Sequence, residues 1–160
     1  MPSYCSLDLY FSGVFMYDPI NVLNEIMMLL GDVGSIVDGL SQYSGCVDVD
    51  YNEQIIFRDG TVVVRGGDVY IVTPYIAIHC YPERCLATID TTSYIIYKGG
   101  RIEIVRLLNQ YYGIWRREDL ERLFNALERS RDGLELAIKE LESGMERLKS
   151  MLAEAKLLCS

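Results

Sequence analysis

Residues 120–148 read LERLFNALERSRDGLELAIKELESGMERL, and this stretch decides the fold of the second half of the chain. Leucine recurs there at every seventh position, at Leu120, Leu127, Leu134, Leu141 and Leu148. A seven-residue apolar repeat lies along one side of an α-helix, so the row predicts a long helix over residues 117–158 with a continuous apolar seam. Such a seam has to be buried, and it therefore predicts a partner for the helix but no chemistry.

The expected length of this helix points to a second chain as that partner. About 40 residues at a rise of about 1.5 Å span about 60 Å, which is longer than a domain of about 115 residues is wide. Leucines that project beyond the domain would each forgo about 1.5–3 kcal/mol of burial, and a second copy is the simplest cover. We therefore predict a homo-oligomer, held together by Leu120, Phe124, Leu127, Leu134, Ile138, Leu141, Met145, Leu148 and Leu152.

The positions that flank the seam decide between forms of pairing. A parallel two-stranded zipper usually pairs opposite charges across the flanks of its seam. One flank here is uncharged and partly small: Leu123, Ser130, Ala137, Gly144, Met151 and Leu158. A wide apolar face of this kind favours antiparallel pairing or a bundle of three or four helices.

A helical hairpin is the alternative to one continuous helix. Glycine inside a helix costs about 1 kcal/mol relative to alanine, and Asp132-Gly133 also has the form of a helix start. A turn at residues 130–133 would let the chain cover its own leucines. Leu127 and Leu134 stay in phase across this point, which favours the continuous helix, because a hairpin does not require that register.

Residues 46–105 have the pattern of short strands joined by tight turns. Asp59-Gly60 separates two β-rich runs and predicts a hairpin, because its turn type requires positive φ angles. Gly66-Gly67 and Gly99-Gly100 indicate further turns, so about eight short strands form an antiparallel meander. Several strands, such as 69–72 and 94–97, are apolar on both faces and need cover on both sides, from helices or by closure into a small barrel.

An N-terminal helix completes the expected fold. Residues 4–15 are predicted as an opening strand, and Asp18-Pro19 then has the form of a helix cap followed by the first helical residue. The apolar spacing continues to Leu30, and Gly31 is expected to end the helix. The predicted class is α+β: an antiparallel meander in a curved sheet or small barrel, with one N-terminal helix and a long C-terminal helix. Residues 1–112 would form an acidic globular domain and residues 117–158 the helical extension.

Composition limits the classes of function. The net charge of −8 lies in residues 1–100, which hold 12 acidic and 4 basic residues, whereas residues 101–160 hold 11 of each. An acidic globular part argues against nucleic-acid binding, which needs a cationic surface. No apolar stretch approaches the roughly 20 residues that span a bilayer, and no secretion signal is evident. We therefore expect a soluble, cytoplasmic protein.

The cysteines indicate one candidate disulfide. Cys80 and Cys85 flank a four-residue segment that has the form of a hairpin loop, so the two residues should face each other within disulfide reach. Intracellular disulfides are typical of hyperthermophiles. The presence of only 8 Asn and Gln residues fits that source, since these amides are thermolabile. A thermophilic source is therefore a hypothesis, and the alternative is that these cysteines are small core residues.

No catalytic, metal or cofactor site follows from the sequence. Asp48, Asp50 and Asn52 resemble the opening of a calcium-binding loop, but Glu53 stands where the loop needs glycine. The two aspartates could otherwise form an acid pair or the solvent face of a strand. His79 and Cys80 should point to opposite faces, which argues against a shared zinc ion or a Cys–His dyad. A zinc site from Cys80, Cys85 and a distant Cys46 or Cys5 lacks a close cysteine pair.

Two classes of function remain after these exclusions. The first is a non-enzymatic, oligomerising interaction or scaffold protein, in which the acidic, tyrosine-rich β domain binds an unknown protein partner. The second is a small enzyme or ligand-binding domain with a pocket in the curved sheet. A dimeric transcriptional regulator is a third reading, and it would require a cationic face. A viral or mobile-element origin is a further hypothesis. A flat exposed tyrosine patch would favour the first class, and a deep pocket around His79 or around Asp48 and Asp50 the second.

Overall fold

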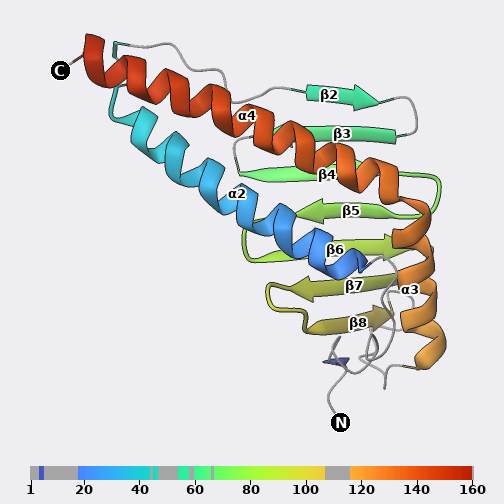
Figure 1. Cartoon of the computed structure of the whole chain (residues 1–160). Helices are drawn as coiled ribbons and strands as arrows, with labels where there is room; N and C mark the ends of the chain where they lie inside the picture. The colour runs from blue at the N-terminus through green and yellow to red at the C-terminus, as the bar shows by residue number, and fades with distance from the viewer. Residues whose placement is uncertain are drawn as a thin grey trace.

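The fold is an open antiparallel sheet with helices on one face. The computed structural model describes residues 4–5, 18–43, 45–46, 54–57, 60–65, 67–106 and 116–159. Its described part holds an eight-stranded sheet and three helices (Figure 1), so the predicted α+β class is confirmed. The sheet is not a barrel, because β1 and β2 form two separate edges.

The strands follow one another across the sheet as a meander. The sheet order is β1-β8-β7-β6-β5-β4-β3-β2, and each neighbouring pair is antiparallel. The bounds are β1 (Tyr4–Cys5), β2 (Gln54–Phe57), β3 (Gly60–Arg65), β4 (Asp68–Val72), β5 (Ala77–Cys80), β6 (Arg84–Ile89), β7 (Thr92–Tyr97) and β8 (Ile102–Arg106). Residues 47–53 of the predicted strand region and residues 6–15 of the predicted opening strand lie outside the described residues.

Alternation along the strands gives the sheet two different faces. Side chains of a strand point alternately to opposite sides, so every second residue is buried. The buried side, here called the inner face, carries Val69, Ile71, Ile78, Cys80, Cys85, Ala87, Ile89, Tyr94, Ile96, Ile102 and Ile104. The helices pack on this inner face and complete the core.

Helix α2 (Pro19–Ser41) begins as predicted but ends later. Asp18 is its N-cap, and its Oδ1 accepts hydrogen bonds from the backbone N–H groups of Ile20 at 3.0 Å and Asn21 at 3.3 Å. The expected end at Gly31 is wrong, because the helix continues for ten more residues. Val33 and Leu40 are buried there, so core packing outweighs the low helix propensity of glycine.

The predicted C-terminal helix is two helices, α3 (Arg117–Arg129) and α4 (Arg131–Leu158), so the continuous helix is wrong. The chain bends at Ser130, within the segment considered for a hairpin turn, but α4 does not fold back along α3 (Figure 1). Ser130 is buried and its Oγ lies 2.7 Å from Thr73 Oγ1 in the β4–β5 turn. This hydrogen bond fixes the bend against the end of the sheet.

Helices α2 and α4 lie side by side across the inner face and run in the same direction (Figure 1). Their close approach is visible at Gly39, where an added Cβ would meet Leu152 Cδ2 at 3.4 Å. By length and composition alone α2 could cross a membrane, which is weak evidence because core helices pass the same test. Its residues packed in the core agree with the role of a core helix.

Candidate functional site

The side of the sheet away from the helices, here called the outer face, carries the histidine and the described charged side chains of strands β4 to β8. It is formed by the alternate residues that the inner face leaves out. Cross-strand register places Tyr70, His79, Leu86, Ile95 and Glu103 in one row across β4 to β8. Within the described residues no helix lies over this row.

A cluster of four side chains lies at the β4 end of this row: Asp68, Tyr70, His79 and Tyr81, here called the histidine cluster. Asp68 Oδ2 lies 2.5 Å from His79 Nε2, and the Tyr81 hydroxyl lies 3.2 Å from His79 Nδ1. The rings of Tyr70 and Tyr81 each have their centroid 4.4 Å from that of His79. The imidazole is therefore in contact with two aromatic rings and hydrogen-bonded at both nitrogens.

Strand geometry explains how the cluster forms. Residues two apart on a strand share a face, which puts Asp68 beside Tyr70 on β4 and aligns Tyr81 with His79 just beyond the end of β5. Tyr70 and His79 are directly opposed across the β4–β5 pair. Opposed aromatic side chains of this kind stabilise a sheet by about 0.2–1 kcal/mol.

The hydrogen bonds of the cluster limit its chemistry. Asp68 Oδ2 accepts a hydrogen bond from His79 Nε2–H, and the Tyr81 hydroxyl is hydrogen-bonded to His79 Nδ1. A general base needs a ring nitrogen within reach of a substrate proton, and both nitrogens here are engaged by the protein. The contacts of the cluster hold the imidazole and the two aromatic rings in place on the outer face.

Exposed apolar area gathers near the same cluster. Tyr70 is 45% exposed and Val72, two residues further along β4, is 43% exposed. Tyr75 in the following turn is 44% exposed, and the Arg129 guanidinium lies 5.4 Å from the centre of its ring. Tyr70 and Val72 share the outer face of β4 and form a local exposed apolar surface, whereas Tyr75 lies in the turn beside Arg129.

The predicted cysteine pair is confirmed at disulfide distance. Cys80 and Cys85 are opposed across β5 and β6 with Cα atoms 4.0 Å apart, and a disulfide joins them on the inner face. Tyr81 N–H donates to Arg84 O just outside this pair. The cysteines therefore occupy the closer, non-hydrogen-bonded position of the ladder, where side chains approach most.

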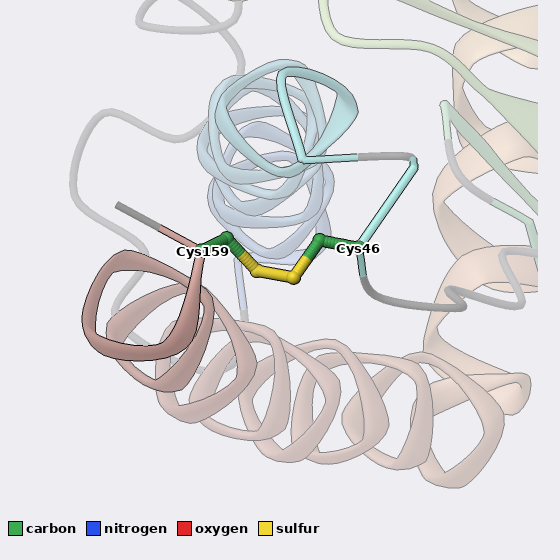
Figure 2. Close-up of a disulfide and its surroundings, with 2 residues drawn as sticks. All are labelled: Cys46 and Cys159. Atoms are coloured by element: carbon green, nitrogen blue, oxygen red, sulfur yellow. A yellow bond between two sulfur atoms is a disulfide. The ribbon is translucent and has the colours of Figure 1, made fainter.

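A second disulfide, between Cys46 and Cys159, was not predicted (Figure 2). It joins the segments that follow α2 and α4, with Cα atoms 6.1 Å apart and 113 residues between them in sequence. The signal that could have found it is the position of each cysteine just past the end of an apolar helix. The expected end of α2 at Gly31 hid that relation.

The two disulfides occupy the cysteines that the zinc sites considered from the sequence would need as ligands. Cys46, Cys80 and Cys85 are all in disulfides and cannot act as thiolate ligands. His79 lies on the outer face and Cys80 on the inner one, which agrees with their expected opposite directions. No group of three or more possible metal ligands occurs among the residues that the structure describes, and Asp48 and Asp50 lie outside them.

The residues predicted to hold two copies together are mostly buried in their own chain. Leu120, Phe124, Leu127, Leu134 and Leu141 are buried against the sheet and α2. The remaining seam residues are only partly buried: Ile138, Met145, Leu148 and Leu152. The projecting seam that required a second chain is therefore largely covered by α2, and self-association through it stays a prediction.

Comparison of the chain with protein-family models, with curated proteins and with solved structures finds no match.

Proposed function

We propose that this chain is a non-enzymatic interaction protein that binds a protein partner through the outer face of its sheet. The observation that carries the proposal is the histidine cluster beside the exposed Tyr70 and Val72. Tyrosine is enriched at protein interfaces because it combines a large apolar ring with a polar tip.

Rigidity supports this proposal. Ordering a free side chain at an interface costs about 0.5–1.5 kcal/mol, and side chains that are already held avoid most of that cost. His79 is fixed by Asp68 and Tyr81, and the ring of Tyr70 packs against it. At the β7 and β8 side of the sheet, Tyr97 donates to Glu103 Oε2 at 3.2 Å and carries the Arg101 guanidinium 4.1 Å from its ring centre.

A small enzyme is the second candidate, and the chain of hydrogen bonds from Asp68 through His79 to Tyr81 is what favours it. An acid–base relay has this order of groups. The engagement of both imidazole nitrogens and the exposure of Tyr70 speak for the interaction reading instead. A transcriptional regulator is less well supported, because the described exposed ion pairs, such as Arg117–Glu121 and Arg131–Glu135, balance the basic residues of the helices.

The disulfides bear on where such a protein would work. Two disulfides persist only where thiols are not kept reduced, which includes the cytoplasm of hyperthermophiles. A cytoplasmic protein from such a source therefore remains our proposal for localisation.

Site-specific photo-crosslinking tests the interaction surface. A photoreactive phenylalanine at Val72 probes the outer face, and the same residue at Met28 is the control, since Met28 is 57% exposed on α2. We expect a discrete protein adduct in source-cell extract from the Val72 position only. Excess wild-type chain should abolish the adduct, whereas excess Leu86→Lys chain should not. Equal labelling from both positions would contradict the proposal.

A further inference from the structure

The outer face is more apolar than a solvent-facing sheet surface normally is. Antiparallel sheets with one wet side alternate apolar and polar residues. Leu86 and Ile95 instead stand at the middle of the central row, between His79 and Glu103. The adjacent row reads Val72, Ala77, Thr88, Ser93 and Val105. Each strand from β4 to β8 therefore has at least one apolar residue on the outer face, at Val72, Ala77, Leu86, Ile95 and Val105.

We propose that the partner of this face is the same face of a second copy of the chain. This inference rests on the proposed function, because it names the occupant of that interaction surface. The two sheets would pack face to face around a two-fold axis, with the helices of each copy on the outside. The contact is then isologous, which means that both copies use the same set of residues. Every contact between two residues therefore occurs twice, once in each direction across the two-fold axis.

Shape favours a second sheet as the occupant. Strands twist with a fixed hand, and two sheets of the same hand pack with their strands about 30° apart and their inner surfaces interdigitated. The outer face is the open side of such a sheet, formed by an unbroken series of antiparallel neighbours from β2 to β8. An identical sheet is complementary to it without any change of fold.

The available area is sufficient for a stable dimer. Seven strands at about 4.8 Å spacing and about five residues at about 3.3 Å give a face of about 34 by 17 Å. The two copies would together cover about 1,100 Å² in projection, and side-chain relief adds to this. Specific interfaces need about 1,000 Å² or more.

The charges of the face do not oppose self-docking. Its described charged residues are of both signs: Asp68, Arg84 and Glu103, with Arg101 over the ring of Tyr97. The Asp68 carboxylate is already paired with His79, so little unpaired charge would be desolvated. The net charge of −8 repels two copies at long range, and salt screens that repulsion over about 8 Å at physiological ionic strength. Added salt should therefore strengthen the dimer.

Sedimentation velocity of the full-length chain tests this inference. We expect a dimer at concentrations up to about 100 µM, above the dissociation constants of weak interfaces. Leu86→Lys places a charge at the centre of the face and should weaken dimerisation at least about 30-fold, as loss of a central anchor does. Met28→Lys adds the same charge to the exposed side of α2 and should leave the dimer unchanged.

A second measurement covers the case in which Leu86→Lys fails to fold. The purified chain with a photoreactive phenylalanine at Val72 should give an adduct of twice the 18.2 kDa chain mass. A wild-type chain that stays monomeric, or a folded Leu86→Lys chain that still dimerises, overturns the inference. A chain that stays monomeric but crosslinks from Val72 to a different protein in extract refutes the second copy as the partner and supports the proposed function. A chain that stays monomeric and gives no protein adduct from Val72 refutes both the inference and the proposed function.

Discussion

Removal of the Cys46–Cys159 disulfide should lower the thermal stability of the protein by a large and calculable amount. A disulfide stabilises mainly by restricting the unfolded chain, and the effect grows with the loop that it closes. The 113-residue separation gives an entropy change whose free-energy equivalent is about 4.8 kcal/mol at 25 °C. The short separation of 5 residues at Cys80–Cys85 gives only about 2 kcal/mol.

The expected shift in melting temperature follows from the size of the chain. Unfolding entropy is about 2.1 cal/mol/K per residue, or about 0.34 kcal/mol/K for 160 residues. Loss of about 4.8 kcal/mol therefore predicts a decrease of about 14 °C. Calorimetry of the double variant Cys46→Ser with Cys159→Ser measures it. The substitutions are mild because Cys46 is exposed and Cys159 only partly buried.

Mild reduction supplies an independent arm of the same test. Cys80 and Cys85 are fully buried, so a mild reductant should open only the Cys46–Cys159 bond in the native protein. Reduced wild-type protein should then have the same melting temperature as the double variant, and the reductant should not change the melting temperature of the variant itself. Cys5→Ser is the control, since neither disulfide includes Cys5. A double variant that melts within about 2 °C of wild type would refute the loop-entropy reasoning.

Three smaller perturbations test the helical layer by chemical denaturation. Gly133→Ala should stabilise the protein by about 0.5–1 kcal/mol, because the new Cβ meets Thr73 and Ile71 methyl groups at an ordinary 3.6 and 3.7 Å; a decrease in stability would contradict it. Ser130→Ala should cost about 1–3 kcal/mol by removing the buried hydroxyl that bonds Thr73, and Thr73→Ser, which keeps the bond, should cost less. Asp18→Ala should cost about 1 kcal/mol, and Asp18→Asn much less, because the cap needs only an oxygen acceptor.

The strands could be predicted from the sequence because their signals are local. Turn residues and alternation mark each strand, and the meander then follows from short connections. Pairing of β2 with β3 confirms the predicted hairpin but not its turn residues, because Gly60 lies in β3 opposite Phe57 instead of in the turn. The extent of α2 could not be found in this way, because glycine propensity predicts an end at Gly31. Burial of Val33 and Leu40 against the rest of the core decides otherwise.

The histidine cluster was within reach of the sequence but was not found. Period-two alternation puts His79 and Tyr81 on one side, and likewise Asp68 and Tyr70. The register that brings the two pairs together depends on the turn at residues 73–76, where Thr73 Oγ1 accepts from the backbone N–H groups of Tyr75 and Ile76. That turn has no glycine signal, so the opposed positions could not be assigned in advance.

The leucine row shows why a heptad pattern does not by itself identify an intermolecular helix pair. The repeat requires only that one side of a helix meets an apolar surface, and α2 together with the sheet provides that surface within the chain. The uncharged flank has the same cause, since Leu123, Ser130 and Ala137 are all buried. Leu127 and Leu134 keep their phase through the bend at Ser130 because both sides of the bend pack on one layer. Once the seam is covered, Tyr70 and Val72 stay exposed on the outer face, and we place the proposed dimer contact there. The exposed Leu157 and Leu158 lie only at the C-terminal end of α4 and do not extend the seam.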